Sequence, residues 1–155
     1  MAPELLVSAC LLGRACRYDG ASKRHPRVAD EAASWRSAGG QVVAVCPEEL
    51  GGLDTPRPAA GLTGGDGAAV LAGDARVVRN DGGGDVTEAF VLGARRAAAC
   101  APGARRAILK ARSPSCGCAG TWIDGRIQPG DGVFAALLRS RGVSVQTEEA
   151  LERSS

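Results

Sequence analysis

The chain has 155 residues, of which 45% are hydrophobic and 23% charged, enough apolar material for one core in a single domain spanning residues 1–155. A net charge of +2 and an aromatic content of 3% argue against a wide basic surface or stacking platform for extended nucleic acid. No apolar run approaches the roughly 20 residues that cross a bilayer, and the first residues lack a basic signal region. We therefore expect a cytoplasmic protein without a membrane partner.

Strand and helix patterns alternate along the chain. Continuous apolar runs predict buried strands at residues 5–10, 41–46, 107–111 and 143–147. Helical patterns lie between them, at residues 28–37, 86–99 and 132–141. This alternation predicts an α/β fold, a single domain with a mainly parallel sheet and flanking helices in a Rossmann-like arrangement.

Two β-hairpins are predicted as insertions between these elements. In the first, residues 69–71 and 76–78 flank a turn at residues 72–75. In the second, residues 121–123 and 126–127 flank the Asp-Gly turn at residues 124–125.

The six cysteines require an explanation other than disulfides, because the cytoplasm keeps thiols reduced. Cys10 and Cys46 end two predicted strands, and Cys116 follows a third strand after a tight turn. The carboxyl ends of parallel strands share one edge of a sheet, where ligands bind, so these three cysteines should converge. Packing in the core is the alternative use of any single cysteine, and it is our interpretation of Cys100 in an Ala-rich helix.

Three converging thiolates suggest a metal centre. Zinc sites usually take ligands in close pairs such as C-x₂-C, whereas Cys116 and Cys118 form C-x-C and Cys10 and Cys16 form C-x₅-C. A cubane iron–sulfur cluster on three cysteines would leave one iron open to a substrate. We expect Cys16 and Cys118 near the site without a ligand role.

Several longer motifs occur in a fixed order along nearly the whole chain. They are residues 7–13 (VSACLLG), 16–20 (CRYDG), 45–48 (VCPE), 50–53 (LGGL), 55–57 (TPR), 64–67 (GGDG), 85–90 (DVTEAF), 110–117 (KARSPSCG) and 130–133 (GDGV). With these motifs the sequence resembles the thiouracil desulfurases, a family of small bacterial proteins.

The resemblance implies a 4Fe–4S cluster held by Cys10, Cys46 and Cys116, and a non-redox conversion of 2- or 4-thiouracil to uracil. It also implies functional roles for Glu48, two residues after the second ligand, and for Ser113, ahead of the third. Cys16 stands where the family often has an apolar residue, so an exchange of ligands between Cys16 and Cys10 stays open.

In this interpretation the open iron acts as a Lewis acid on the soft thiocarbonyl sulfur, and water adds to the ring carbon. Glu48 would take the proton of that water, while Glu49, the next residue of an extended segment, would face the other side. Capping of a following turn is the alternative role for either glutamate.

Several polar and aromatic side chains are candidates to bind the base. Ser113 and Ser115 could bond to its ring, although serines in such turns commonly satisfy the backbone. Tyr18, in a loop that could close over the site, could stack on the base, with surface packing as the alternative. Lys110 and Arg112 could neutralise the cluster or a phosphate, with solvated surface charge as the default.

Two further functions fit the same residues. One is a sensing module that holds zinc or a redox-sensitive cluster on the three cysteines. The other is an enzyme that acts on thiolated tRNA, and the net charge of +2 speaks against it. The choice among thiolated base, nucleoside, nucleotide and tRNA, and the oligomeric state, stay open at this point.

Overall fold

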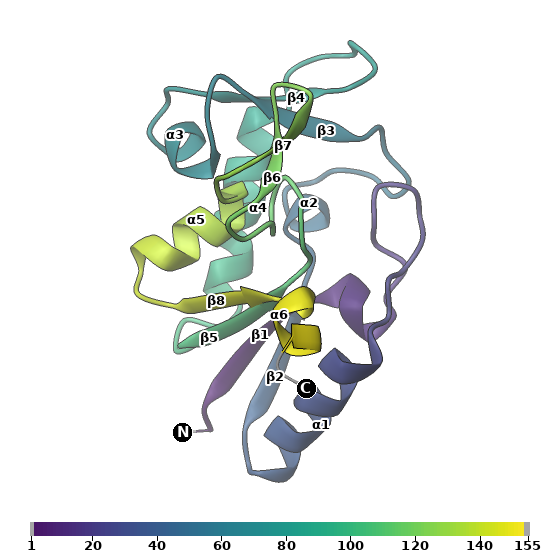
Figure 1. Ribbon diagram of the computed structural model, residues 1–155, viewed down its shortest axis with the longest axis vertical. Coiled ribbons are helices and arrows are strands. Elements are labelled where there is room, and N and C mark those ends of the chain that lie inside the picture. The colour runs from purple at the N-terminus through teal and green to yellow at the C-terminus, as the bar shows by residue number, and fades with distance from the viewer. Residues whose placement is uncertain (1, 154–155) are drawn as a thin grey trace.

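The computed structural model describes residues 2–153, which form two β-sheets and the helices packed on them (Figure 1). The first sheet is entirely parallel and consists of β1 (Glu4–Ser8), β2 (Gln41–Val45), β5 (Arg106–Leu109) and β8 (Ser144–Thr147). Its strand order is β2-β1-β5-β8. All four strands predicted from apolar runs are therefore present, and the predicted α/β fold with a parallel sheet is confirmed.

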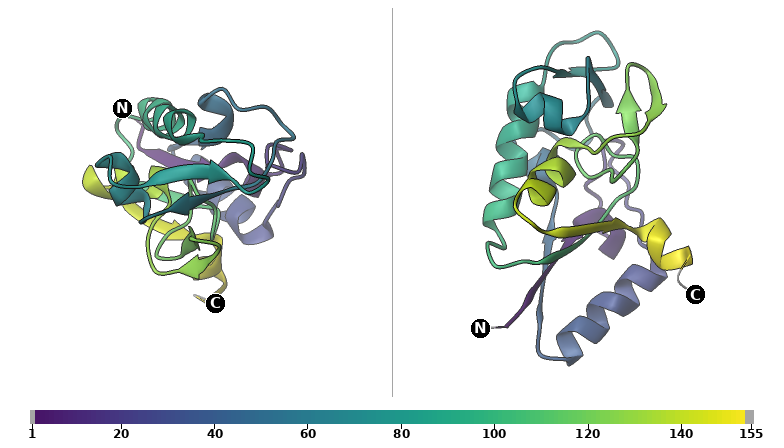
Figure 2. Two further views of the ribbon diagram at one scale, coloured as in Figure 1. Left: turned by 90° about the horizontal axis from the view of Figure 1, so that it is seen from above. Right: turned by 60° about the vertical axis from the view of Figure 1, so that its left-hand side comes forward.

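Helices cover both faces of the parallel sheet (Figure 2). Leu5 of β1 packs towards α1 (Pro26–Ser37), whereas Leu6 packs towards α4 (Thr87–Ala99) and α5 (Val133–Ser140). Successive side chains of a strand point to opposite faces, and here both faces are buried. That is why these strands appear in the sequence as unbroken apolar runs instead of alternating ones.

The second sheet is mixed and lies beyond the carboxyl ends of the parallel strands (Figure 1). It is formed by β3 (Ala60–Thr63), β4 (Arg76–Arg79), β6 (Thr121–Ile123) and β7 (Arg126–Gln128), in the order β4-β3-β6-β7. The predicted hairpin at the Asp-Gly turn is the antiparallel pair of β6 and β7 and is confirmed. No local pattern in the sequence indicated β3 or a separate sheet.

The other predicted hairpin is wrong. Residues assigned to its first strand belong to a short helix, α3 (Gly67–Leu71), and β4 pairs instead with β3. The Asp66 side chain accepts a hydrogen bond of 3.1 Å from the backbone N–H of Ala69 and so caps the first turn of α3. This local cap outweighs the weak strand preference of a three-residue apolar run.

Three of the parallel strands, β1, β2 and β5, end earlier than predicted, and in β1 and β2 this changes how their cysteines are held. Beyond β1 the chain turns into a 3₁₀ helix, η1 (Ala9–Leu12), which contains Cys10. Beyond β2, Cys46 occupies the position before α2 (Pro47–Leu50). Both cysteines therefore lie in the first turn after a strand, on a rigid element.

The chain ends in α6 (Glu148–Arg153), which is tied to the start of α1 through the only histidine. His25 accepts a bond from the Val28 N–H at the start of α1, and its Nε2 lies 2.8 Å from Glu152. His25 is thus a partly buried helix cap. Among residues 2–153, we find no helix with the length and apolar character to span a bilayer.

Candidate functional site

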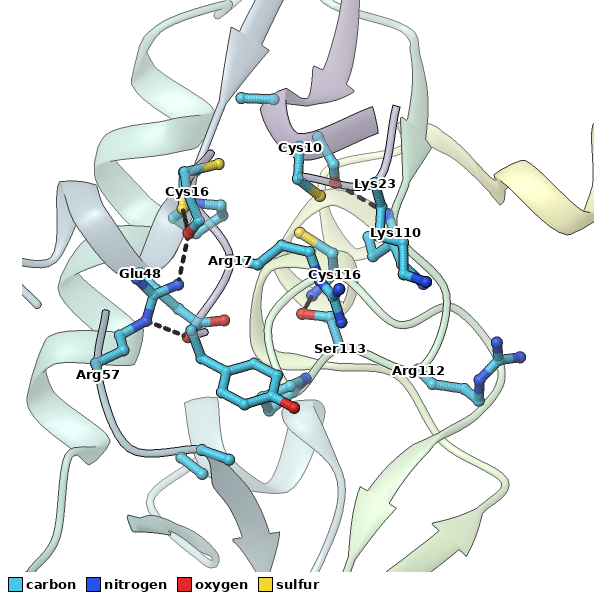
Figure 3. A pocket seen from close by; sticks show the side chains of 18 of the residues that line it. Cys10, Cys16, Arg17, Lys23, Glu48, Arg57, Lys110, Arg112, Ser113 and Cys116 are labelled. Carbon is cyan, nitrogen blue, oxygen red and sulfur yellow. Dashed lines mark hydrogen bonds and ion pairs between the residues drawn. The ribbon is translucent and has the colours of Figure 1, made fainter. Parts of the chain in front are cut away.

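One cavity of about 490 Å³ opens where the parallel strands end and the mixed sheet begins (Figure 3). Cys10 follows β1, Cys46 follows β2, and Cys116 follows β5 after a turn, and all three line this cavity. The expected convergence of the three cysteines is present in the structure. Cys16 lines the same cavity, as we expected of a neighbour of the site.

Cys10 is held in η1 with 6% of its surface exposed. Its carbonyl accepts hydrogen bonds from the backbone N–H groups of Gly13 and Lys23, which close the turn around it. Burial raises the pKa of the Cys10 thiol to about 11, and the nearby Lys110 ammonium opposes that rise. Without a bound metal, the raised pKa therefore favours the neutral thiol of Cys10 at pH 7.

Cys46 stands at the start of α2 beside the buried Cys16. A hydrogen bond from the Cys16 thiol lowers the pKa of Cys46 to about 7, in spite of burial, and the backbone N–H of Glu49 contributes in the same direction. The Cys46 sulfur also lies 3.6 Å from the Cys16 carbonyl oxygen. The shared hydrogen bond and burial both raise the pKa of Cys16, so Cys46 loses its proton more readily than Cys16 does.

The turn that contains Cys116 is anchored on the amino end of α5. The Pro114 and Ser115 carbonyls accept hydrogen bonds from the first N–H groups of α5, which have no partner inside the helix. Gly132 permits this approach, because a Cβ at that position would lie 2.6 Å from the Ser115 backbone. Burial raises the pKa of Cys116, and a hydrogen bond from Ser8 opposes it.

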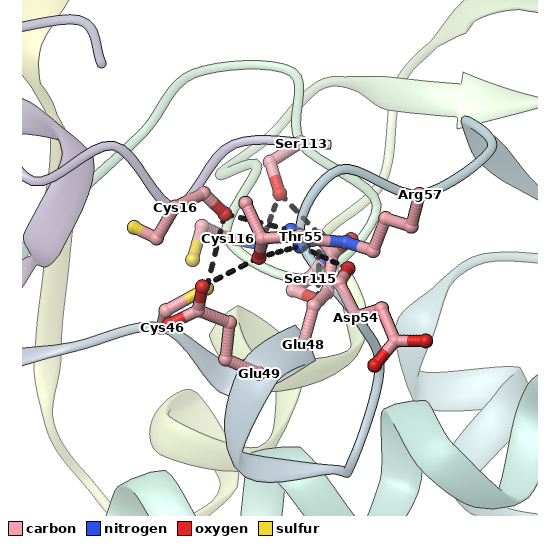
Figure 4. A network of polar contacts seen from close by, with 10 residues as sticks. All are labelled: Cys16, Cys46, Glu48, Glu49, Asp54, Thr55, Arg57, Ser113, Ser115 and Cys116. Atoms are coloured by element: carbon pink, nitrogen blue, oxygen red, sulfur yellow. Dashed lines mark hydrogen bonds and ion pairs between the residues drawn. The ribbon is translucent and has the colours of Figure 1, made fainter. Parts of the chain in front are cut away.

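Glu48 faces the same cavity from the first turn of α2, and its side chain is 16% exposed. Its Oε1 accepts a hydrogen bond of 3.0 Å from Arg57 Nε, and its Oε2 lies 3.4 Å from the Ser115 hydroxyl (Figure 4). A close approach of α2 to α4 fixes this turn: a Cβ at Gly93 of α4 would lie 1.9 Å from the Pro47 carbonyl oxygen.

Glu48 and Glu49 do not lie in an extended segment, and that expectation is corrected. Both are in the first turn of α2, where carboxylates also suit the positive end of the helix. Their surroundings nevertheless differ. Glu49 is not among the residues that line the cavity, and it pairs with Arg14 at 2.8 Å. It also accepts a hydrogen bond from Thr55 (Figure 4).

The two candidate serines have different surroundings. Ser113 lines the cavity, and its hydroxyl oxygen accepts bonds of 3.1 Å from the N–H groups of Ser115 and Cys116. The hydroxyl proton of Ser113 remains available to a molecule in the cavity. Ser115 is 1% exposed and is not part of the lining, so its side chain reaches Glu48 and not the open space.

Cationic side chains accompany the cysteines. Those that line the cavity near them are Arg17, Lys23, Lys110 and Arg112. Lys23 and Lys110 lie close to Cys10, on the other side of the cavity from Glu48 (Figure 3). Lys110 is not a solvated surface charge, because its side chain is 16% exposed and lies 3.0 Å from the buried Glu148. Arg112 pairs with Glu149 at 2.7 Å.

Two aromatic side chains border the cavity. Tyr18 is 43% exposed and Trp122 46% exposed, and they come from the loop after η1 and from β6. Both chain phenylalanines, in contrast, are fully buried in the core. From the sequence we identified Tyr18 as a candidate to stack on a base, but we assigned Trp122 only to a predicted hairpin. For Trp122, the available signal in the sequence was a large apolar ring in a short hairpin.

Two other contributors were missed or misplaced. Arg57, which binds Glu48, appeared in the sequence only as part of a proline-flanked motif, and nothing local predicted that it is buried. Cys100, interpreted as a core residue, is instead exposed at the end of α4. The helix has its buried face on the side of Ala94 and Ala97, and Cys100 lies beyond its last turn.

No three Cys, His, Asp or Glu side chains within residues 2–153 are grouped closely enough to hold a single metal ion. A structural zinc ion requires its ligands to meet at one point, about 2.3 Å from each sulfur. A cubane binds each cysteine through a different iron atom, so its ligands stand around a larger volume. Cys10, Cys46 and Cys116 line one cavity of about 490 Å³ from three different segments of the chain.

Comparisons with known proteins agree with this site. Residues 5–150 match the family model of 2-thiouracil desulfurase. The chain is 42% identical over 156 residues to the uncharacterized protein YbbK of Bacillus subtilis (strain 168), covering 95% of this chain and 97% of that protein. It also matches a solved structure of the [4Fe-4S]-dependent thiouracil desulfidase TudS, with a TM-score of 0.78, 39% identity and coverage of 97% of this chain and 94% of that one. The resemblance inferred from the sequence motifs is thereby confirmed.

Proposed function

The chain belongs to the 2-thiouracil desulfurase family, and we propose that it removes the sulfur from a thiolated uracil with a 4Fe–4S cluster held by Cys10, Cys46 and Cys116. The observation that carries this proposal is the meeting of three cysteines and the Glu48 carboxylate in one cavity. The name of the similar solved protein, which includes both the cluster and thiouracil, adds support.

The residues around the cavity suit an iron–sulfur cluster. None of the three cysteines is in a disulfide, and cysteine thiolates are the usual ligands of such clusters. Lys110 and Arg17 act on Cys10 in the direction that favours its thiolate, which helps to balance the negative charge of three such ligands. When bound, the cluster supplies an open iron that acts as a Lewis acid on the thiocarbonyl sulfur.

Glu48 is proposed to move the proton. The overall reaction adds one water to the thiobase and releases uracil and hydrogen sulfide, with no net transfer of electrons. As water adds to the ring carbon, the Glu48 carboxylate accepts one of its protons, and that proton then leaves with the sulfur. Arg57 and Ser115 hold the carboxylate at the cavity wall for this task.

The base itself is proposed to be held by groups at the floor and the mouth of the cavity. Ser113 can donate its hydroxyl proton to a ring carbonyl, because its oxygen is already occupied by two backbone N–H groups. Tyr18 and Trp122 offer aromatic faces on which a flat ring can stack. Ser115 is reassigned from substrate binding to the orientation of Glu48, since it does not line the cavity.

Anaerobic purification, metal and sulfide analysis, and incubation with 2- and 4-thiouracil test this function. We expect about four irons and four sulfides per chain and the release of uracil and sulfide in equal amounts. A colourless protein that carries zinc and releases no sulfide would contradict the proposal and favour a sensing module.

The same preparation tests the non-redox mechanism. We expect many turnovers per chain without an added reductant or electron carrier, because the reaction is a hydrolysis. Strict dependence of product yield on a stoichiometric electron donor would contradict this mechanism while leaving the cluster in place.

A further inference from the structure

Arg57 lines the main cavity, and its side chain is 6% exposed. Its guanidinium donates four hydrogen bonds. The acceptors are Glu48 Oε1 at 3.0 Å, the Asp54 carbonyl at 3.1 Å, Thr55 Oγ1 at 2.9 Å and the Cys16 carbonyl at 2.9 Å. Because the guanidinium is planar and its four acceptors are fixed, the Arg57 side chain is held in one orientation.

These bonds connect parts of the site that are far apart in the sequence (Figure 4). The Cys16 carbonyl that accepts from Arg57 also lies 3.6 Å from the Cys46 sulfur. The Arg57 backbone N–H donates to the Tyr18 carbonyl at 2.7 Å, so the loop before Tyr18 is attached at two points. Arg57 thus joins the carboxylate, one cysteine and the loop with the exposed tyrosine.

The contact with Glu48 also determines which way the carboxylate faces. Glu48 and Arg57 together form a wall between the main cavity and a second one of about 180 Å³, because both residues line both spaces. Leu53, Val86 and Phe90 make much of the second cavity apolar. With Oε1 held by Arg57 and Oε2 near Ser115, the carboxylate has little freedom to rotate into that second space.

We propose that Arg57 is the positioning residue of the reaction: it holds Glu48 at the wall of the main cavity in the orientation that proton transfer requires. This inference rests on the proposed function, in which Glu48 accepts the proton of water. Arg57 acts through Glu48 and not on the substrate.

An exposed counterpart on the same helix supplies a matched control. Glu49 pairs with Arg14 at 2.8 Å, but the Arg14 side chain is 61% exposed and has no place in the cavity lining. Arg57→Lys and Arg14→Lys therefore make the same chemical change to two Glu–Arg pairs whose glutamates are neighbours in α2. Lysine keeps the positive charge and loses the planar fork.

We expect Arg57→Lys to lower kcat by about 10- to 100-fold, the usual effect of removing a supporting hydrogen-bond partner. KM and the absorption change on adding thiouracil should stay within about twofold of the parent's, because the substrate contacts are intact. Arg14→Lys should leave kcat unchanged. Equal losses of kcat in the two variants would overturn the inference.

The sharper measurement is a double-mutant cycle with Glu48→Gln. If Arg57 acts through Glu48, Arg57→Lys should lower kcat by less than about twofold in the Glu48→Gln background. The same fold-loss in both backgrounds would show a merely structural role for Arg57 and overturn the inference.

Thermal unfolding of the same four proteins supplies a readout that does not depend on turnover. The two substitutions should shift the unfolding temperature by less than the sum of their separate shifts, because they remove one shared contact. Additive shifts would show that the pair is not formed in solution, against the inference. If Arg57→Lys fails to fold, Thr55→Val, which removes one Arg57 acceptor, replaces it, with a smaller loss of kcat that again disappears in the Glu48→Gln background.

Failure of the inference is distinguishable from failure of the proposed function. A parent protein that turns over no thiouracil removes the proposed function and the inference with it. An active parent whose Arg57 and Glu48 variants give independent losses removes the inference alone.

Discussion

The two sheets of this molecule contribute to the same cavity in different ways. The parallel sheet is buried on both faces, and the residues beyond its strand ends supply cysteine sulfur and the Glu48 carboxylate. The mixed sheet supplies Ala60 and Trp122 to the cavity lining, with Asn80 just beyond β4, and parts of its β6–β7 hairpin are exposed. The candidate reactive groups thus follow the strands of the buried parallel sheet, and the more exposed mixed sheet contributes other parts of the lining.

This division suits catalysis at a bound cluster. A group that must stay within a fraction of an ångström of a reacting atom is best placed on a well-packed element. A surface that selects among flat bases tolerates more variation, because stacking is broad in geometry and every base has an aromatic face. We therefore expect substitutions at the ends of the parallel strands to lower turnover. Substitutions in the mixed sheet should instead weaken substrate binding and raise KM.

The largest effect should come from the cysteines at the ends of the parallel strands. Replacing Cys10, Cys46 or Cys116 with serine should abolish both the visible absorption and the activity, because each is proposed to supply a thiolate to the cluster. Absorption spectra, iron analysis and sulfide release measure this. Cys100→Ser is the control, and it should leave both properties unchanged, since Cys100 is exposed at the end of α4.

Cys16 decides whether the ligand set is correct. It is buried in the same cavity beside Cys46, so it is the strongest competitor for a ligand position. Loss of the cluster in Cys16→Ser together with its retention in Cys10→Ser would mean that the first ligand is Cys16.

The next largest effect should come from Glu48. Glu48→Gln keeps size and polarity but removes the base, so turnover should fall by roughly two to four orders of magnitude. The cluster should remain, and thiouracil should still change its absorption spectrum, because neither depends on the proton acceptor. Stopped-flow absorption and product assays separate these two steps.

Glu49→Gln is the matched control for that experiment. Glu49 occupies the same helical turn but lies outside the cavity lining and pairs with Arg14. Its replacement should change turnover far less. An inactive Glu49→Gln beside a normally active Glu48→Gln would show that the carboxylate was assigned wrongly, even with the cluster in place.

The smallest effect should come from the mixed sheet. Stacking of a base on an aromatic side chain contributes about 1–3 kcal/mol, so Trp122→Ala should raise KM at least about fivefold and leave kcat nearly unchanged. Ile127→Ser, the cross-strand neighbour of Trp122, is exposed and outside the cavity lining, and should change neither constant. A large loss of kcat in Trp122→Ala would contradict the expectation that the mixed sheet affects binding and not turnover.

The sequence by itself determined the parallel sheet and the positions of its cysteines. Buried strands appear as unbroken apolar runs, and parallel strands end at a common edge, so residues as distant as Cys10 and Cys116 could be placed together without coordinates. The role expected of Glu48, two residues after Cys46, came from the resemblance to the thiouracil desulfurases. The other inferences use local patterns and one general rule of topology.

Only the tertiary structure decided what surrounds those groups. Arg57 and Ser115 both contact the Glu48 carboxylate, and Trp122 lines the same cavity. These residues come from distant segments, and the local sequence of each segment does not indicate its partners. The same holds for α3, where one side-chain cap outweighed an apolar run. Such contacts depend on how elements pack, and periodicity along a chain records which face of a strand or helix is buried but not which residue it meets.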